Sequence, residues 1–253
     1  MNRITDYLKL TCNIVGWLCR YNDKHKLNGF VVGVSGGIDS AVASTLAAKT
    51  GLPVYAVGMP INQKLEQETL SDAHLFWLEK TYENVTVLKV DLSETFGKFV
   101  STIGDECGVE YAINDLAKAN SRSRLRMMTL YQIAQSVGGL VVGTGNKVED
   151  YGIGFYTKYG DGGIDIAPIA DLYKTEVREL GRFLGVIPEI IDAKPTDGLW
   201  DDGRTDEDQI GATYEQLEEA METGSGPALP VLQKFYTQNR HKIDPIPTYL
   251  LEE

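Results

Sequence analysis

Short apolar runs alternate with longer stretches of helical periodicity along the first 140 residues. The apolar runs have the pattern expected of strands that are buried on both faces of a parallel sheet. They cover residues 30–34, 52–59, 85–90 and 139–142. The stretches with helical spacing cover residues 3–21, 39–47, 63–80, 92–104 and 109–136. This order of strands joined by helical crossovers predicts an α/β fold, with a doubly wound, Rossmann-like parallel sheet and helices on both faces.

The rest of the chain alternates helical patterns with two irregular segments. Residues 151–163 contain five glycines and cannot be a regular helix or strand throughout, and residues 194–209 are rich in Asp and Gly. Long loops of this kind in compact domains are usually lids or disordered segments. Helical spacing returns over residues 171–184, 188–193, 214–221 and 229–239. No linker or internal repeat divides the sequence, so we expect one domain over residues 1–253.

The first predicted strand runs into a short loop with the features of an anion-binding site. Residues 35–40 read Ser-Gly-Gly-Ile-Asp-Ser and lead directly into a helical pattern. Glycines let the backbone approach a ligand, its N–H groups point outward, and the helix dipole favours negative charge. The loop lacks the Lys of a Walker motif, and its glycine spacing differs from the dinucleotide fingerprint. It resembles instead the pyrophosphate loop of the ATP pyrophosphatase superfamily, whose members split ATP into AMP and pyrophosphate.

This resemblance implies that the loop and the end of the strand bind ATP, with the two serines and the loop amides on the outgoing pyrophosphate. The implied ATP-binding residues are Gly33, Val34, Ser35, Gly36, Gly37, Ile38, Asp39 and Ser40. Asp39 would also ligate Mg²⁺, which prefers hard carboxylate oxygens. The alternative is an ordinary glycine turn between strand and helix, with Asp39 as an acidic residue of the first helical turn.

Charge and composition narrow the range of partners. The net charge is −12 and the pI is about 4.8, so no basic face is available to follow a nucleic-acid backbone. Cys12, Cys19 and Cys107 include no Cys-x-x-Cys pair, which argues against a zinc site or a disulfide framework. No apolar run approaches the roughly 20 residues of a membrane helix, and the N-terminus lacks the apolar core of a signal peptide. We expect a cytoplasmic protein that binds neither nucleic acid nor membranes.

Four further motifs occur in the order found in NAD synthetases. Residues 120–127 read Asn-Ser-Arg-Ser-Arg-Leu-Arg-Met, and residues 143–149 read Gly-Thr-Gly-Asn-Lys-Val-Glu. Residues 155–165 read Phe-Tyr-Thr-Lys-Tyr-Gly-Asp-Gly-Gly-Ile-Asp, and Pro195-Thr196 follows later. The Thr-Lys-Tyr-Gly-Asp-Gly-Gly run is far more specific than the pyrophosphate loop, which several ligases share. From that loop almost to the C-terminus, the chain therefore resembles the ammonia-dependent NAD synthetase family.

The resemblance implies a C–N ligase that catalyses the last step of NAD biosynthesis. Members of the family use ATP and Mg²⁺ to adenylate the nicotinate carboxylate of deamido-NAD, and ammonia then displaces AMP to give NAD⁺. A carboxylate is a poor acyl donor. Joining it to AMP creates a reactive mixed anhydride, and magnesium offsets the charge of the departing pyrophosphate. The acyl-adenylate must also be shielded from water, which would hydrolyse it.

The family pattern assigns roles to individual positions outside the loop. Glu149 pairs with Asp39 as a Mg²⁺ ligand, and Asp39 and Lys174 are the implied catalytic residues. Thr144, Lys174 and Thr196 align with residues that contact ATP. Local alternatives exist for these positions: Glu149 as a solvated acid at a helix start, Thr144 as a capping residue and Lys174 as a solvated lysine.

For deamido-NAD, two phosphates and one carboxylate favour Arg and Lys as hydrogen-bond donors. The aligned positions are Arg124, Lys158, Asp165, His241 and Lys242. Asp165 would accept a hydrogen bond from a hydroxyl or amide of the substrate. The alternatives are that the arginines form the wet face of a long helix and that residues 240–242 are only a charged helix end.

The resemblance does not settle the role of one position, the nitrogen donor or the exact substrate. Gly145-Asn146 stands where many relatives have Asp-His, so any role of that histidine is unfilled here. The pyrophosphate loop begins about 35 residues after Met1, which leaves no room before it for a glutaminase domain with a nucleophilic Cys. Free ammonia is therefore the expected nitrogen donor, with a separate glutaminase partner as the alternative. The sequence does not decide between deamido-NAD and the corresponding mononucleotide as the substrate.

We also expect a homodimer, because the family is dimeric and the helix after Arg126 is rich in Met and Leu. The alternative is that this apolar face packs in the core. Two rival functions are another amidoligase with a pyrophosphate loop, as in GMP or asparagine synthesis, and a non-catalytic nucleotide sensor. The first would lack the Thr-Lys-Tyr-Gly-Asp-Gly-Gly run. Loss of Asp39 or Glu149 would have favoured the second, and both acids are present, so catalysis is the favoured interpretation.

Overall fold

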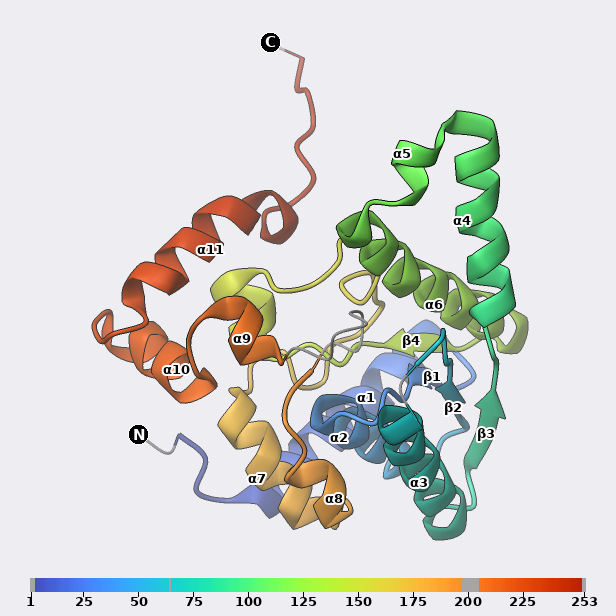
Figure 1. Cartoon of the computed structure of the whole chain (residues 1–253). Coiled ribbons are helices and arrows are strands. Elements are labelled where there is room, and N and C mark those ends of the chain that lie inside the picture. The colour runs from blue at the N-terminus through green and yellow to red at the C-terminus, as the bar shows by residue number, and fades with distance from the viewer. Residues whose placement is uncertain (1–2, 64, 197–204, 252–253) are drawn as a thin grey trace.

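The computed structural model describes residues 3–63, 65–196 and 205–251, and a parallel β-sheet lies at its centre. The strands of this sheet are β1 (Phe30–Gly33), β2 (Val54–Gly58), β3 (Val85–Lys89) and β4 (Leu140–Val142). They lie in the order β3-β2-β1-β4, and each neighbouring pair is parallel (Figure 1). The order reverses at β1, because the chain crosses from β3 to the far side of β1 before it forms β4. In doubly wound sheets this switch point, at the carboxyl ends of the strands, is where ligands bind.

β1 is apolar because helices cover both of its faces. Phe30 and Val32 contribute to the core on one face of the sheet, and Val31 contributes to the core on the other face. All three side chains are fully buried. This alternation confirms the prediction of a parallel sheet with helices on both faces.

The first face is covered by helices from two separate parts of the sequence. These are α1 (Tyr7–His25), α2 (Ile38–Ala48), α3 (Leu65–Thr81) and α7 (Lys174–Leu184), with the short α8 (Pro188–Ile191) after α7. Gly181 lets α7 approach α2 closely, because a Cβ at that position would lie 2.7 Å from Ile38 Cδ1. This packing ties α7, which begins with Lys174, to the start of α2, which carries Asp39.

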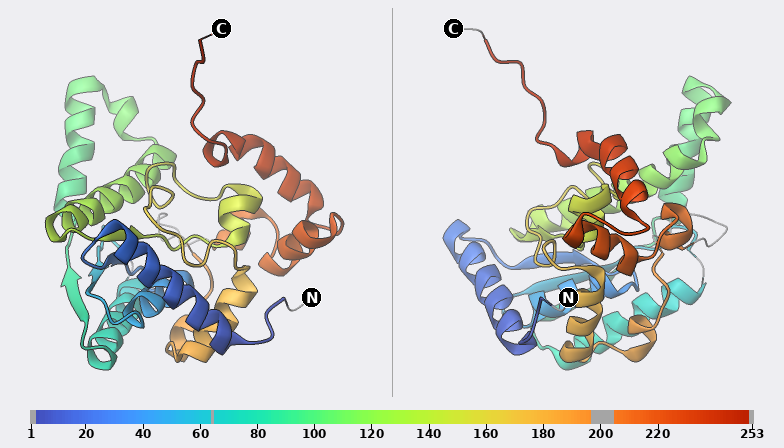
Figure 2. Two further views of the ribbon diagram at one scale, coloured as in Figure 1. Left: turned by 180° about the vertical axis from the view of Figure 1, so that it is seen from behind. Right: turned by 90° about the vertical axis from the view of Figure 1, so that its left-hand side faces the viewer.

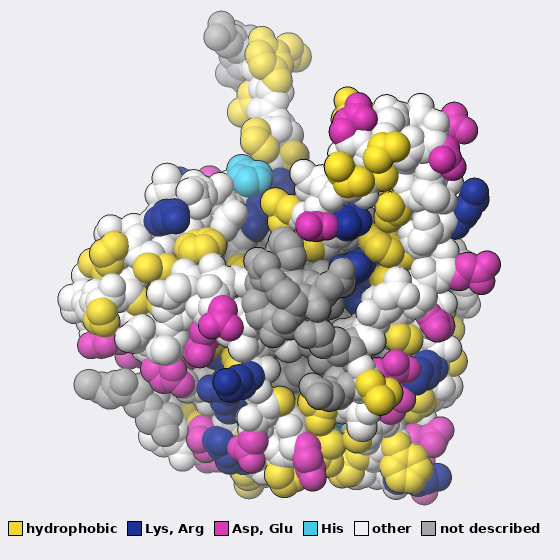
Figure 3. All heavy atoms as spheres, viewed as in Figure 1, with side chains coloured by type: hydrophobic (Ala, Val, Ile, Leu, Met, Phe, Trp, Pro, Cys, Tyr) yellow, Lys and Arg dark blue, Asp and Glu magenta, His cyan; other side chains and the backbone are white. Residues whose placement is uncertain are grey.

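Acidic and basic side chains are interspersed over much of the surface seen in Figure 3.

The second face is covered by α4 (Ser93–Cys107) and α6 (Asp115–Val137), which are joined through the short α5 (Val109–Ala112). Met127, Leu130 and Ala134 of α6 are buried in the core of this face, together with residues of the sheet and of α4. Most of the apolar face that follows Arg126 therefore packs in the core, as in the alternative interpretation, whereas Met128 is exposed. The homodimer itself stays a prediction. An amphipathic helix that covers a sheet packs its apolar side chains against that sheet, so these side chains are not available to a partner protein.

The remaining helices surround a third apolar cluster beside the sheet. They are the single-turn π-helix η1 (Val148–Ile153), α9 (Asp206–Ile210), α10 (Tyr214–Thr223) and α11 (Leu229–Ile243). Tyr214, Leu217 and Ile153 are the largest fully buried side chains of this cluster. The chain beyond α11 extends away from the body of the protein (Figure 2). None of the described helices is both long and apolar enough to cross a membrane.

Two predicted segments differ from the structure. The helical pattern over 109–136 is broken, because the Asn114 side chain accepts a hydrogen bond from the Ala117 amide and starts a new helix, α6. The segment 194–209 was expected to be irregular, yet it contains most of α9, whose first turn Thr205 caps. Residues 197–204 of that segment lie outside the described part of the chain. A few capping contacts thus set element boundaries that apolar spacing does not define.

His74 of α3 is a buried group whose charge state should influence stability. Its Nε2 lies 3.0 Å from the Ser44 hydroxyl of α2, and burial lowers the pKa of His74 from 6.5 to about 4. The folded protein therefore favours neutral imidazole. The neutral imidazole therefore makes its full contribution to the unfolding free energy above about pH 6.5. As the pH falls towards 4, the unfolded state gains a proton on His74 first, and about 2–3 kcal/mol of the unfolding free energy is lost. His74→Gln should remove this pH-dependent part, which urea denaturation at pH 7 and pH 4.5 measures.

His25 provides the matched control, because it is exposed at the end of α1. His25→Gln should leave the pH dependence of the unfolding free energy as it is in the wild type. If the free-energy difference between wild type and His74→Gln stayed constant between the two pH values, His74 would not have the role described here.

Candidate active site

The glycine loop lies between the carboxyl end of β1 and the start of α2, at the switch point of the sheet. Ser40 Oγ organises the loop: it accepts a hydrogen bond from the Ser35 amide at 3.1 Å and donates to the Gly37 carbonyl at 2.9 Å. Gly36 has a φ of +87°, a conformation that glycine adopts without strain. Gly37 is the N-cap of α2 and has no side chain to cap the helix. The first N–H groups of α2 can therefore serve an anion.

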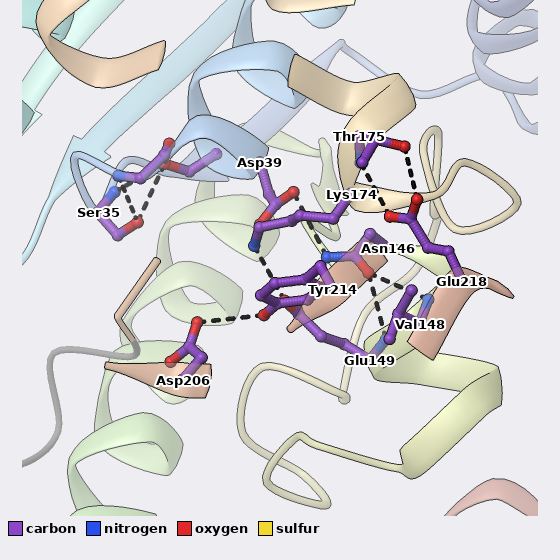
Figure 4. Close-up of polar contacts among 12 residues, drawn as sticks. Ser35, Asp39, Asn146, Val148, Glu149, Lys174, Thr175, Asp206, Tyr214 and Glu218 are labelled. Atoms are coloured by element: carbon purple, nitrogen blue, oxygen red, sulfur yellow. Dashed lines mark hydrogen bonds and ion pairs between the residues drawn. The ribbon is translucent and has the colours of Figure 1, made fainter. Parts of the chain in front are cut away.

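Lys174, the first residue of α7, lies between two acids from distant parts of the chain (Figure 4). Its Nζ lies 2.5 Å from Oδ2 of Asp39 in the first turn of α2, and 3.0 Å from Oε1 of Glu149 in η1. Only 4% of the Lys174 side chain is exposed, against 15% for Asp39 and 16% for Glu149. The three residues that the family pattern implies as catalytic or metal-binding are thus in direct contact. We call them the charge cluster.

Burial opposes the charges of this cluster, and the contacts within it offset that effect for Lys174 and Glu149. For Asp39, burial outweighs the Lys174 ammonium and raises the pKa of the carboxyl above its ordinary value. Burial alone would lower the pKa of Lys174, yet the carboxylates of Asp39 and Glu149 raise it above its ordinary value. Burial would raise the pKa of Glu149, but the Lys174 ammonium and the Tyr214 hydroxyl hold it below its ordinary value. Burial, together with the charge of Glu149, raises the pKa of neighbouring Asp150 to about 8. At neutral pH, Lys174 is therefore protonated and Glu149 is ionised.

Two buried residues outside the predicted site hold the acids in position. Asn146 Oδ1 accepts hydrogen bonds from the amides of Val148 and Glu149, at 3.1 and 3.2 Å, and so fixes the start of η1. Tyr214 of α10 donates its hydroxyl proton to Glu149 Oε1 at 2.6 Å. In the sequence, Asn146 is visible only as a departure from the Asp-His of many relatives. Tyr214 belongs to no motif, and nothing in its surroundings distinguishes it from an ordinary core aromatic.

A single cavity connects the glycine loop with the charge cluster. It is lined by the whole segment 33–40, and its wall also includes Thr144, Glu149, Lys174 and Thr196. Residues 58–60, at the carboxyl end of β2, form another part of the wall. The structure thus brings together every position that the family pattern assigns to ATP or Mg²⁺.

A second cavity adjoins the first, and its wall is basic. The residues that line both cavities are Met127, Tyr156 and Ile164. Arg124, Lys158 and Lys242 line the second cavity only. On the face shown in Figure 3, Lys and Arg side chains gather between α11 and α6. These basic side chains are the ones expected of a site for a phosphate-bearing substrate.

Three of the five positions aligned with deamido-NAD contacts, Arg124, Lys158 and Lys242, line this second cavity. Arg124 Nε donates to the Lys158 carbonyl at 3.2 Å, and Lys158 Nζ donates to the His241 carbonyl at 3.0 Å. Lys242 Nζ donates to the Tyr156 carbonyl at 2.8 Å. His241 itself is exposed, and the contact that reaches it here involves only its backbone.

The fifth position, Asp165, is bonded by the protein itself. Its carboxylate accepts hydrogen bonds from the Tyr131 hydroxyl at 2.9 Å and from the Val141 amide at 2.8 Å. It lies next to Ile164, yet it is not among the described residues that line either cavity. The expectation that Asp165 accepts a hydrogen bond from the substrate stays a prediction, and the structure adds a role in joining β4 to α6.

The specific run 157–163 folds into a tight turn against α6. Asp161 Oδ1 accepts hydrogen bonds from the Ser123 hydroxyl at 2.7 Å and from the Thr157 amide at 3.0 Å. Gly160 is required by close packing, because a Cβ there would lie 2.2 Å from Ser123 Oγ. The turn follows directly after Tyr156, which it holds at the boundary between the two cavities.

The two acids of the charge cluster suit a divalent cation that arrives with a nucleotide. Among the described residues, no group of three or more His, Cys, Asp and Glu side chains could hold a metal ion without other ligands. Mg²⁺ is commonly held by one or two carboxylates together with substrate phosphates and water. Asp39 and Glu149 already converge on one cation, the Lys174 ammonium. Their oxygens therefore fit Mg²⁺ as part of a shared protein–phosphate site.

The fold and site so far define a doubly wound α/β protein with a candidate anion site at the switch point of its sheet. Comparison with known proteins identifies the family. A family model described as NAD synthase matches residues 10–237. The chain belongs to the NAD synthase family and is an enzyme of the ligase class.

Individual relatives match over nearly the whole chain. The NH(3)-dependent NAD(+) synthetase of Carboxydothermus hydrogenoformans is 38% identical over 236 residues, which are 92% of this chain and 93% of the relative. The structure of NMN synthetase from Francisella tularensis has a TM-score of 0.89 and 33% identity, and covers 98% of this chain and 100% of that one. NAD+ synthetase from Burkholderia pseudomallei has a TM-score of 0.75 and 27% identity, with 94% and 90% covered.

Lys174→Met should reveal how strongly the charge cluster depends on its ammonium. The substitution keeps most of the volume but leaves two largely buried carboxyl groups without their counter-charge. Removing one partner of a buried ion pair costs about 3–5 kcal/mol, so we expect a loss of about 3 kcal/mol in the unfolding free energy at pH 7. Urea denaturation followed by circular dichroism measures it.

Lys118→Met is the matched control. Lys118 pairs with Asp115 on the surface, where 75% of the Asp115 side chain is exposed. Exposed pairs of this kind contribute less than about 1 kcal/mol. Equal losses from Lys174→Met and Lys118→Met would show that the charge cluster is not a buried ionic unit.

Proposed function

We propose that the protein uses ATP and Mg²⁺ to adenylate the nicotinate carboxylate of deamido-NAD. Ammonia then forms the amide, and AMP, pyrophosphate and NAD⁺ are released as in the last step of NAD biosynthesis. The observation that carries this proposal is the meeting of the glycine loop with Asp39, Glu149 and Lys174 in one cavity beside a basic one. Membership of the NAD synthase family supports it.

The first cavity would bind ATP. The N–H groups of the glycine loop and of the α2 N-terminus suit the β- and γ-phosphates, which become the pyrophosphate. Asp39 and Glu149 would hold Mg²⁺ together with these phosphates, and the metal would offset the charge of the departing pyrophosphate. Lys174 Nζ now lies between the two acids, so it would have to turn toward the phosphates when the nucleotide binds.

The second cavity would bind the nicotinate nucleotide. Arg124, Lys158 and Lys242 offer charged donors for phosphate and carboxylate groups. The wall shared through Met127 and Tyr156 would place the nicotinate carboxylate next to the α-phosphate of ATP. A carboxylate oxygen would attack that phosphorus, and the bond to the pyrophosphate would break.

Free ammonia is the nitrogen donor in this proposal. The relative from Carboxydothermus hydrogenoformans is named as NH(3)-dependent, and it matches this chain over nearly its whole length. Ammonia would attack the carbonyl carbon of the acyl-adenylate, AMP would leave with the electron pair of the broken bond, and loss of a proton would give the amide. A glutaminase domain is not needed for this chemistry.

We also propose that the chain is a single cytoplasmic domain that works as a homodimer. The resemblance to a dimeric family supports this assembly. The region around α5 adds a structural argument, because it exposes large apolar side chains. Val109, Tyr111, Ile113 and Leu116 are between 59% and 66% exposed. Neighbouring exposed apolar side chains of this kind often mark a protein–protein interface.

Nicotinate mononucleotide is a second candidate substrate. NMN synthetase from Francisella tularensis matches this fold with a TM-score of 0.89, against 0.75 for NAD+ synthetase from Burkholderia pseudomallei. The reacting carboxylate would be the same in both substrates, and only the adenylyl half would be missing. The two candidates therefore differ in what the outer part of the basic cavity must bind.

Turnover of the purified protein tests the reaction, the nitrogen source and the metal together. With ATP, Mg²⁺, deamido-NAD and ammonium, we expect one AMP for each NAD⁺, and glutamine should not replace ammonium. Excess chelator should abolish turnover, because the pyrophosphate would leave without its counter-charge. A coupled dehydrogenase follows NAD⁺, and chromatography quantifies AMP.

The outcomes separate the alternatives. Turnover that persists in chelator would contradict a metal site made by Asp39 and Glu149. ATP binding without amide formation would point to a nucleotide sensor or to another adenylating ligase. In the same assay, deamido-NAD should have a higher kcat/KM than nicotinate mononucleotide, and the reverse order would identify the mononucleotide as the substrate.

A further inference from the structure

Tyr214 is a buried member of the site to which the reaction outlined above gives no role. It is the first residue of α10 and is fully buried. Its hydroxyl lies 2.6 Å from Glu149 Oε1, and its ring lies below the Lys174 ammonium, with Nζ 4.8 Å from the ring centre. One side chain therefore contacts both an acid and the lysine of the charge cluster (Figure 4).

The position of Tyr214 is fixed by a second residue on the same face of α10. Glu218 follows four residues later, about one helical turn along. Its carboxylate accepts hydrogen bonds from the Thr175 amide at 3.0 Å and from the Thr175 hydroxyl at 2.6 Å. Thr175 follows Lys174 directly in the chain. α10 is thus joined to the start of α7, and the Tyr214 hydroxyl is held in place relative to Lys174.

The hydroxyl directs its single proton at Glu149. A phenol has one proton to donate, and two carboxylates lie near it: Glu149 at 2.6 Å and Asp206 at 3.3 Å. The shorter contact is the one to Glu149. Lys174 Nζ reaches the same oxygen, Oε1, at 3.0 Å. Two donors from different helices therefore restrict the rotation of the Glu149 carboxylate.

We propose that Tyr214 is a positioning residue, whose hydroxyl holds Glu149 in the orientation that binds Mg²⁺ with ATP. This inference rests on the proposed function, in which Asp39 and Glu149 hold the metal. Once Lys174 turns to the phosphates, the short hydrogen bond from Tyr214 remains to keep Glu149 oriented. Removing the hydrogen-bond partner of a metal ligand typically costs 10–100-fold in metal affinity or activity.

Tyr214→Phe tests the proposal, because it removes one oxygen and keeps the ring that contacts Lys174. Calorimetric titration with ATP at increasing Mg²⁺ concentrations gives a readout without turnover, since the nicotinate substrate is left out. We expect the Mg²⁺ concentration that half-saturates ATP binding to rise about 10-fold or more. The ATP affinity at saturating Mg²⁺ should stay close to that of the wild type.

Two further proteins make the result specific. Tyr7→Phe removes a buried hydroxyl of α1 that has no hydrogen-bond partner among the described residues, so it should leave the Mg²⁺ dependence unchanged. Glu149→Gln should itself weaken Mg²⁺ binding. If Tyr214 acts through Glu149, then Tyr214→Phe should have little further effect in the Glu149→Gln background, because the two changes are coupled.

Each outcome decides one question. A Mg²⁺ dependence of Tyr214→Phe equal to that of the wild type, or full additivity with Glu149→Gln, would overturn the positioning role and leave the proposed function standing. ATP binding by the wild type that does not depend on Mg²⁺ would overturn the proposed metal site, and the role of Tyr214 with it. A large rise in the Mg²⁺ requirement that disappears in the Glu149→Gln background supports the proposal.

Discussion

The site depends on the ion pairs that the Lys174 ammonium makes with the carboxylates of Asp39 and Glu149. Lys174 is separated from Asp39 by 135 positions in the sequence and from Glu149 by 25. A largely buried charge is costly without its counter-charge, so this contact constrains the starts of α2, η1 and α7 at the same time. The same arrangement places the carboxylate oxygens of Asp39 and Glu149 next to the N-terminus of α2, which has no side-chain cap. Stability and proposed chemistry thus rest on one cluster.

The fold assembles this cluster by ordinary packing. The order β3-β2-β1-β4 places the ends of β1 and β4 side by side, so the segments that follow them share one edge of the sheet. Gly181 brings α7 against the start of α2, and Asn146 fixes the first turn of η1. The tight turn over 157–163 then places a basic cavity next to the first. Each element reaches the site through apolar packing or a local hydrogen bond that does not itself take part in binding.

The sheet and the glycine loop could be predicted from the sequence because their signals are local: apolar runs, glycine spacing and a helix start. The family motifs placed Asp39, Glu149 and Lys174 in one site, but not in contact with each other, since that contact depends on how α7 packs on α2. Tyr214 could not be found, because a buried aromatic in a helix has the same pattern whether its hydroxyl is used or not. The sequence left open whether the apolar face after Arg126 packs in the core or forms an interface for a related reason: spacing shows that a helix is amphipathic, but not which surface it covers.

In the proposed function, Asp39 and Glu149 hold Mg²⁺ when ATP binds, and the Lys174 ammonium moves from these acids to a phosphate. The most direct test is a crystal structure of the protein with Mg²⁺ and an ATP analogue that cannot be cleaved. We predict a metal ion ligated by Asp39, Glu149 and phosphate oxygens, with Lys174 Nζ moved from the carboxylates to a phosphate. A metal bound away from the two acids, with Lys174 still between them, would contradict it.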